Sequence, residues 1–176
     1  MEQPIVNYFI DFEFHETKTT IEPISLGIAV DAPGDPVRYI EFDFDEPVVR
    51  AENPWVVANV LPHLEWAPDE RMDFEEAKIA IYNTIATDSR PRFWGYFSST
   101  DWVLFYRIWG RMLDLPTHFP RHCMDVRQLF EHLGRPEGCR PPEPPNAHHA
   151  LVDARGIRAF HRNLMAYAQA RGIPIA

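Results

Sequence analysis

Hydrophobic and polar side chains alternate in three successive runs over the first 45 residues. In IVNYFIDFEF, residues 5–14, the alternation puts one set of side chains on one face (Val6, Tyr8, Ile10, Phe12, Phe14) and a second set on the other (Asn7, Phe9, Asp11, Glu13). Residues 21–30 and 37–45 show the same period of two, and the turn residues APGDP separate them. This pattern predicts three strands in an antiparallel meander.

After residue 45 the periodicity becomes helical, and short strands alternate with the helices. The pattern predicts a short helix over 52–61 that stops near Pro62, and a second helix that begins at Asp73 with Glu76 in a capping box. The aromatic run RFWGYF, residues 92–97, predicts a strand. It leads into a helix whose apolar face is formed by Leu104, Phe105, Ile108, Trp109 and Met112.

Towards the C-terminus, a short helix is expected over 125–133. Residues 134–146 contain five prolines and two glycines, which predict a loop. The last helix should run from about residue 150 to 171, with a buried stripe of Ile157, Phe160, Leu164 and Tyr167. Strands followed by alternating helices and strands indicate an α/β fold, in which helices cover both faces of a mixed sheet.

Composition narrows the class of protein. The 176 residues, 45% of them hydrophobic, fit one globular domain over 1–176. The net charge of −9 is not that of a protein that coats nucleic acid, although residues 1–70 hold 15 acidic and 3 basic side chains while the remainder is slightly basic. No apolar run reaches transmembrane length and the start MEQPIV does not resemble a signal peptide, so we expect a cytoplasmic protein without a membrane partner.

Two carboxylates on the first predicted strand are the first candidates for chemistry. Asp11 and Glu13 are two residues apart, so both leave the same face with Cα atoms about 6.5 to 7 Å apart. Because that strand is hydrophobic on both faces, a buried pair there needs cations or protons to offset its desolvation. A divalent metal ion would supply that charge. The alternative is that the pair lies at an exposed strand end.

Further candidates lie at two helix starts. Asp101 follows the aromatic strand, where it could either face a site or complement the helix dipole. Asp153 shares the buried stripe of the last helix, and an inward carboxylate needs a partner. His148 and His149 stand five and four residues before it. The tryptophans Trp55, Trp94 and Trp102 could stack on nucleic-acid bases, or they could pack in the core.

Taken together, the order D-x-E, D, H-x-x-x-x-D formed by Asp11, Glu13, Asp101, His148 and Asp153 resembles the DEDDh 3′-to-5′ exonucleases of the ribonuclease H-like superfamily. The stretches NYFIDFEF, PISLGIAV, WVVANVLPHL, FWGYFSSTDWVLFYRIWG and HHALVDARG are more specifically similar to a small bacterial exoribonuclease group, related to ribonuclease T and oligoribonuclease and typified by a mycobacterial enzyme. FSSTD departs from many superfamily members, which carry an asparagine before the third acid.

The resemblance implies a ribonuclease H-like fold and release of 5′ mononucleotides from RNA 3′ ends, single-stranded or overhanging, by two-metal-ion hydrolysis. Asp11 would bridge two Mg²⁺ or Mn²⁺ ions, and Glu13, Asp101 and Asp153 would complete their ligand shells. His148 would be the general base. His149 is expected to have a packing or surface role. Relatives commonly form homodimers, so a homodimer is a further expectation.

Two other functions stay open from the sequence. A DNA 3′-to-5′ exonuclease of the proofreading type would need the same carboxylates and histidine, so motif chemistry does not separate it from an exoribonuclease. A module that binds nucleic acid without cutting it would gain nothing from a costly acidic cluster, and the retention of all four acids argues against it.

Overall fold

A mixed sheet of five strands forms the centre of the computed structural model, which describes residues 3–86 and 89–175. The strand order is β3-β2-β1-β4-β5, where β1 pairs antiparallel with β2, β2 pairs antiparallel with β3, and β1, β4 and β5 are parallel. The strands are β1 (Ile5–Glu16), β2 (Ile21–Val30), β3 (Val37–Glu41), β4 (Arg90–Gly95) and β5 (Met124–Asp125). The predicted meander and mixed sheet are confirmed.

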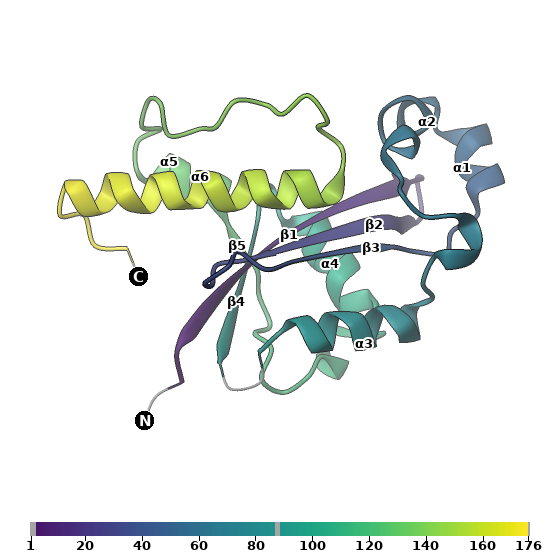
Figure 1. Ribbon diagram of the computed structural model, residues 1–176, viewed down its shortest axis with the longest axis horizontal. Coiled ribbons are helices and arrows are strands. Elements are labelled where there is room, and N and C mark those ends of the chain that lie inside the picture. Colours follow the sequence, from purple (N-terminus) through teal and green to yellow (C-terminus); the bar gives the residue numbers. More distant parts are fainter. Residues whose placement is uncertain (1–2, 87–88, 176) are drawn as a thin grey trace.

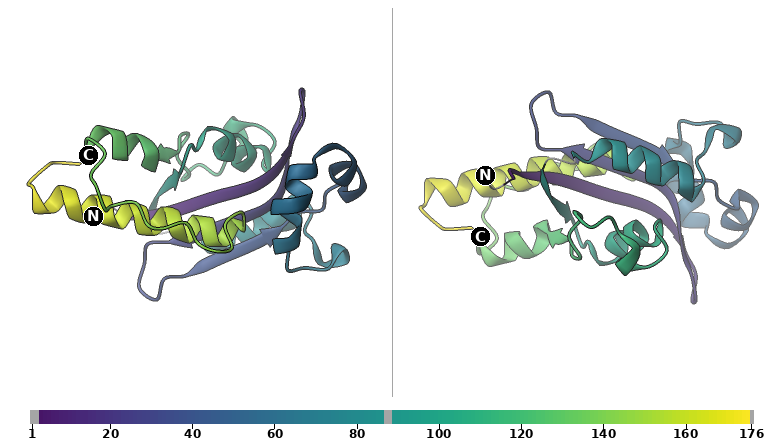
Figure 2. Two further views of the ribbon diagram at one scale, coloured as in Figure 1. Left: turned by 90° about the horizontal axis from the view of Figure 1, so that it is seen from above. Right: turned by 90° about the horizontal axis from the view of Figure 1, so that it is seen from below.

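Helices cover both faces of this sheet (Figures 1 and 2). One face carries the long helix α6, with α5 beside it, and the other carries α3 and α4. The short helices α1 and α2 lie beyond one end of the sheet. The helices are α1 (Glu46–Glu52), α2 (Pro54–Asn59), α3 (Phe74–Thr84), α4 (Ser99–Arg107), α5 (Val126–His132) and α6 (Ala150–Ala170). None of the helices in the described ranges has the length and apolar character to cross a membrane.

The alternation along β1 divides its side chains between two cores. Tyr8, Ile10 and Phe12 are buried in the core under α3 and α4. Phe9 is buried on the opposite face, in the core under α6. A strand that is apolar on both faces is central in its sheet, and β1 indeed lies between β2 and β4.

Several predicted boundaries are wrong. The helix expected over 52–61 is the shorter helix α2, which begins after Asn53 because the Asn53 side chain caps it at the Val56 N–H. The helix α1, which precedes it, is absent from the prediction. The third strand ends at Glu41 instead of residue 45. The two-residue strand β5 is too short for any periodicity to reveal. Met112 does not share the apolar face of α4, because that helix ends at Arg107 and Met112 is 40% exposed.

A glycine lets α6 approach the sheet closely. Gly27 of β2 pairs with Asp11 of β1, and a Cβ atom on it would lie 2.2 Å from the carbonyl oxygen of Ala150 at the start of α6. Such a separation is a severe overlap with backbone atoms, which cannot move aside as a flexible side chain can. Helix and strand therefore touch through their backbones at this point.

We predict that Gly27→Ala destabilises the fold by at least about 1 to 3 kcal/mol, because the added methyl group must push α6 away from β2. Gly156→Ala is the matched control within α6, where an added Cβ meets nothing within 4 Å. It should stabilise the protein by roughly 0.5 to 1 kcal/mol. Urea unfolding of the three proteins measures both changes, and equal stability of the Gly27→Ala and wild-type proteins would contradict the backbone contact.

Candidate active site

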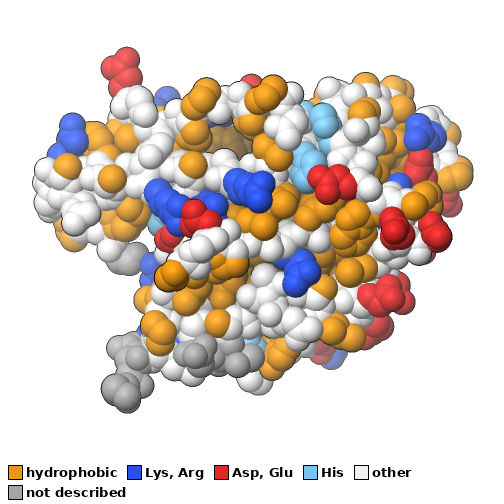
Figure 3. Space-filling view, in the orientation of Figure 1, with side chains coloured by type: hydrophobic (Ala, Val, Ile, Leu, Met, Phe, Trp, Pro, Cys, Tyr) orange, Lys and Arg blue, Asp and Glu red, His pale blue; other side chains and the backbone are white. Residues whose placement is uncertain are grey.

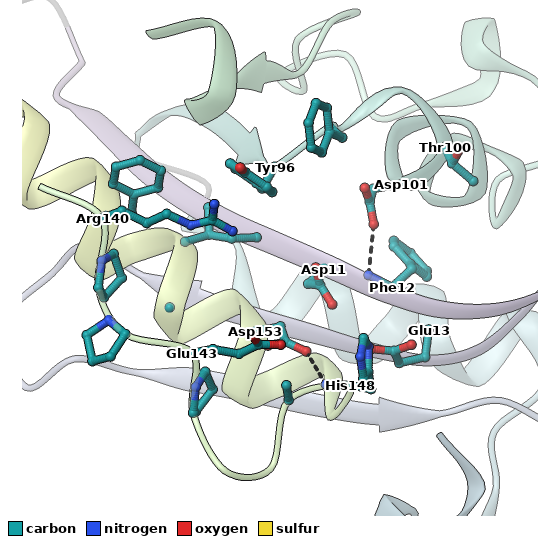
Figure 4. Close-up of a pocket in the computed structure, with 18 of the residues that line it drawn as sticks. Asp11, Phe12, Glu13, Tyr96, Thr100, Asp101, Arg140, Glu143, His148 and Asp153 are labelled. Carbon is teal, nitrogen blue, oxygen red and sulfur yellow. Dashed lines mark hydrogen bonds between the residues drawn. The ribbon is translucent and has the colours of Figure 1, made fainter. Parts of the chain in front are cut away.

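A cleft of about 540 Å³ opens where β1, α4, α6 and the proline-rich loop meet (Figure 4). The five residues singled out in the sequence motif all line it: Asp11, Glu13, Asp101, His148 and Asp153. They come from two strand positions, one helix start, one loop and one further helix, so the fold gathers residues that are up to 142 positions apart.

Asp11 and Glu13 reach the cleft from β1. Because successive strand side chains alternate, both leave the face that α6 covers. Glu13 is only 8% exposed. The alternative of an exposed strand end is therefore wrong, since the pair lies inside the sheet's central strand.

Asp101 is held against β1 by a backbone hydrogen bond. Its Oδ1 accepts from the Phe12 N–H at 2.9 Å, and both groups are buried. The parallel pairing of β1 with β4 ends at Phe9, which leaves the later part of this edge open to a carboxylate. Asp101 lies in the first turn of α4, and the side chain is turned to β1 and the cleft.

Asp153 and His148 are fixed to each other. Asp153 Oδ2 accepts from the His148 backbone N–H at 2.7 Å. His148 has a φ of +68° and lies in the loop before α6, so the loop sets the direction of its side chain and helical phase does not. Potential ligand atoms of Glu13, His148 and Asp153 lie within 4.8 Å of one another.

His149 turns away from the cleft. Its Nδ1 accepts from the Leu151 N–H at 3.2 Å and caps α6, while its Nε2 lies 3.0 Å from Glu65 Oε1. Its ring packs on Tyr39 with centroids 4.6 Å apart. Figure 3 shows histidine side chains in pale blue where the loop enters α6, beside the α1–α2 segment. His149 has the packing role that the sequence allowed for it.

The four carboxylates repel one another in a poorly solvated place. Burial, reinforced by the charges of Asp101, Glu13 and Asp153, holds the pKa of Asp11 well above its usual range. Burial together with the charges of Asp153 and Asp101 raises the pKa of Glu13 to about 8.

The other two acids are partly relieved by backbone donors. Burial raises the pKa of Asp101 to about 6, although the Phe12 N–H opposes the shift. Burial also raises the pKa of Asp153, and the His148 N–H opposes it. A cluster of oxygen donors that cannot all ionise without added positive charge fits hard divalent cations, which prefer such ligands.

The mouth of the cleft carries aromatic and basic side chains. Trp55 is 53% exposed and meets the His148 ring edge-on at 4.8 Å, whereas Trp94 and Trp102 are buried in the two cores. Arg140, in the proline-rich loop, lines the cleft on another side. Trp55 is thus the tryptophan that can still stack on a base.

Comparison with known proteins places the chain in a family. No family model matches it. Two curated 3′-5′ exoribonucleases of Mycobacterium tuberculosis, MT2234.1 of strain CDC 1551 and Rv2179c of strain H37Rv, are each 35% identical to it over 164 residues, which is 88% of this chain and 91% of theirs. The chain belongs to this 3′-5′ exoribonuclease family.

Solved structures of another exonuclease share the fold of this chain. Exonuclease I of E. coli in a zinc-bound complex with single-stranded DNA superposes with a TM-score of 0.62 at 16% identity, over 96% of this chain. A second exonuclease I structure, reported for its processivity, gives 0.61 at 15% identity over 94% of this chain. The chain spans 42% of the length of exonuclease I. The similarity therefore concerns one part of that enzyme, and it shows the fold alone.

We predict that Glu13→Gln stabilises the metal-free protein increasingly as the pH rises from 4.5 to about 8. A carboxyl whose pKa is higher in the folded than in the unfolded chain stabilises the fold while protonated, and this contribution is lost as the pH rises through the folded pKa. Glutamine imitates the protonated form. Melting temperatures in EDTA across this pH range measure the effect, with Glu16→Gln as an exposed control on the same strand. A constant difference between Glu13→Gln and wild type would contradict the raised pKa.

Proposed function

We propose that the protein is a metal-dependent 3′-to-5′ exoribonuclease that releases 5′ mononucleotides from single-stranded or overhanging RNA 3′ ends. The observation that carries this proposal is the convergence of four carboxylates and His148 on one cleft, in a chain that is 35% identical to curated 3′-5′ exoribonucleases. A module that only binds nucleic acid would have no use for acids that repel one another so strongly.

In this proposal Asp11, Glu13, Asp101 and Asp153 hold two Mg²⁺ or Mn²⁺ ions. Asp11 lies in the same cleft as the other three acids, and their charges all raise its pKa, so added positive charge would relieve it most. When bound, the ions supply the positive charge that activates a water molecule and stabilises the departing 3′ oxygen. The Phe12 and His148 N–H groups hold Asp101 and Asp153 in place as ligands.

His148 acts as the general base in this proposal. It would take a proton from the water whose oxygen forms the new bond to phosphorus, while the bond from phosphorus to the upstream 3′ oxygen breaks and that oxygen gains a proton from solvent. The left-handed backbone at His148 and the hydrogen bond from its N–H to Asp153 fix the start of the side chain beside the acids. The edge-on contact with Trp55 limits how far the ring can turn.

Trp55 binds one nucleobase of the substrate. Its exposed ring contacts His148, which lines the cleft, and base stacking on such a ring accepts any base. An enzyme that holds only the last few nucleotides needs no long basic surface, which agrees with the net charge of −9. A cytoplasmic location and a homodimer stay predictions from the sequence.

We predict that the wild-type protein shortens 5′-labelled, 3′-tailed RNA one nucleotide at a time with Mg²⁺ or Mn²⁺, and that Asp11→Asn abolishes this hydrolysis. Gel separation of RNA and DNA substrates by product length measures it. Asp69→Asn, at an exposed position outside the cleft, is the matched control and should keep full activity. An Asp11→Asn protein with wild-type activity would overturn the metal assignment, and cleavage of DNA alone would make the protein a DNA exonuclease.

We predict that His148→Ala lowers kcat by roughly 10² to 10⁴ while metal binding is kept, as expected for a lost general base. His149→Ala should keep most of the kcat but lower stability by about 0.5 to 2 kcal/mol, because it removes the cap of α6. Single-turnover rates and thermal melts of the two variants distinguish the roles. If His149→Ala loses the rate and His148→Ala does not, the assignment is reversed.

A further inference from the structure

A second exposed aromatic side chain borders the cleft, and the function described so far does not use it. Phe97 is 63% exposed and lines the cleft between the end of β4 and the start of α4. Its φ of +56° lies in the left-handed region, which a bulky side chain rarely adopts. An exposed phenylalanine in an unfavourable backbone conformation stabilises neither the core nor the turn. Folding stability therefore does not explain why this side chain is here.

The Asp125 carboxylate holds this conformation in place. Its Oδ2 accepts from the Ser98 N–H at 3.0 Å and its Oδ1 accepts from the Phe97 N–H at 3.4 Å. The same Oδ1 accepts from the Arg127 N–H at 2.7 Å and so caps α5. One carboxylate therefore fixes both the backbone that presents Phe97 and the helix that carries Arg127.

Phe97 is part of a surface that combines rings with positive charge. The Arg127 guanidinium lies 5.6 Å from the centre of the Phe97 ring, and the Tyr96 ring lies 4.8 Å from it. Arg140 lies 5.6 Å from the Tyr96 ring and also lines the cleft. Over residues 3–86 and 89–175, no ion pair joins Arg140 to a carboxylate. We call Tyr96, Phe97, Arg127 and Arg140 the Phe97 surface.

Stacking rings beside a guanidinium group suit single-stranded nucleic acid, because bases stack on the rings and a phosphate can pair with Arg140. Arg127 is already ion-paired with Glu131, so it contributes to the ring cluster. The surface is continuous with the acidic cleft, since three of its four residues line that cleft. A nucleic-acid strand whose scissile phosphate lies at the four acids therefore also contacts the Phe97 surface.

The geometry also indicates which part of the strand lies there. Tyr96 and Arg140 lie on one side of Asp11, and Glu13 and His148 lie on the other (Figure 4). In an in-line displacement the attacking water and the leaving oxygen are on opposite sides of the phosphorus. If His148 activates the water, the leaving 3′ oxygen and its nucleoside point towards Tyr96 and Arg140.

We propose that the Phe97 surface binds the nucleoside on the 5′ side of the scissile phosphate, with its base stacked on Phe97 and its phosphate at Arg140. This rests on the proposed function and adds a substrate subsite to it. The product mononucleotide, which lacks the upstream nucleoside, does not use this surface.

The test compares RNA with product in the Asp11→Asn background, which prevents cleavage. Fluorescence anisotropy gives the Kd of a 5′-labelled pentaribonucleotide, and displacement of a labelled nucleotide gives that of adenosine 5′-monophosphate. Phe97→Gly removes the ring, and glycine adopts the left-handed backbone conformation without strain. It should therefore weaken RNA binding by roughly 5- to 150-fold. The Kd of the mononucleotide should not change, and the thermal stability should not fall. Phe97→Trp should restore RNA binding. Arg140→Gln should lower the slope of log Kd against log salt by about 0.7.

Tyr82→Ala is the matched control, because Tyr82 is an exposed aromatic residue of α3 that does not line the cleft. It should bind RNA like its parent. Unchanged RNA binding by Phe97→Gly would overturn the proposal, as would equal losses for RNA and mononucleotide. A failure of the proposed function would look different, since the wild-type protein would then not hydrolyse RNA at all.

Discussion

The backbone contact between β2 and the start of α6 is the constraint on which the site depends. Only a residue without a Cβ allows it, since a methyl group on Gly27 would lie 2.2 Å from the Ala150 carbonyl oxygen. Gly27 pairs with Asp11, so the contact brings the first turn of α6 directly over the acidic part of β1. Further along the helix, Arg158 Nη1 donates to the Val30 carbonyl at 2.9 Å and ties α6 to the end of the same strand. His149 completes the attachment through its cap and its contact with Tyr39.

The close approach of α6 to β2 assembles the acidic cluster, and the same approach destabilises the ionised form of its carboxyl groups. It brings Asp153 to Asp11 and Glu13, and burial then makes every carboxyl in the cluster harder to ionise. Two backbone donors partly offset this effect. The Phe12 N–H donates to one oxygen of Asp101, and the His148 N–H donates to one oxygen of Asp153. Those donors do not neutralise the remaining charge. The acid cluster that the proposed function requires therefore lowers the stability of the metal-free protein, as is usual for a preorganised site.

Much of this arrangement could be predicted from the sequence, because it follows from periodicity. Strand alternation placed Asp11 and Glu13 on one face, and helical spacing placed Asp153 towards the core. Proline content predicted the loop from which His148 projects, so that the loop and not the helical phase of α6 sets its direction. Two features could not be predicted because they depend on a single cap or on contacts between distant residues: the start of α2 after Asn53, with α1 before it, and the strand β5. The exposure of Phe97 cannot be predicted from the local sequence for a related reason, since the Asp125 carboxylate, 28 residues away, holds its left-handed turn.

The proposed function requires the four carboxylates to form a site for divalent cations. Titration of the metal-free protein with Mn²⁺ in the presence of adenosine 5′-monophosphate, with bound ions counted by electron paramagnetic resonance, tests this requirement directly. We expect two bound ions per chain for the wild-type protein and for Phe97→Gly, and a loss of metal binding for Asp11→Asn. An Asp11→Asn protein that still binds two ions, or a wild-type protein that hydrolyses RNA without binding any, would contradict this requirement.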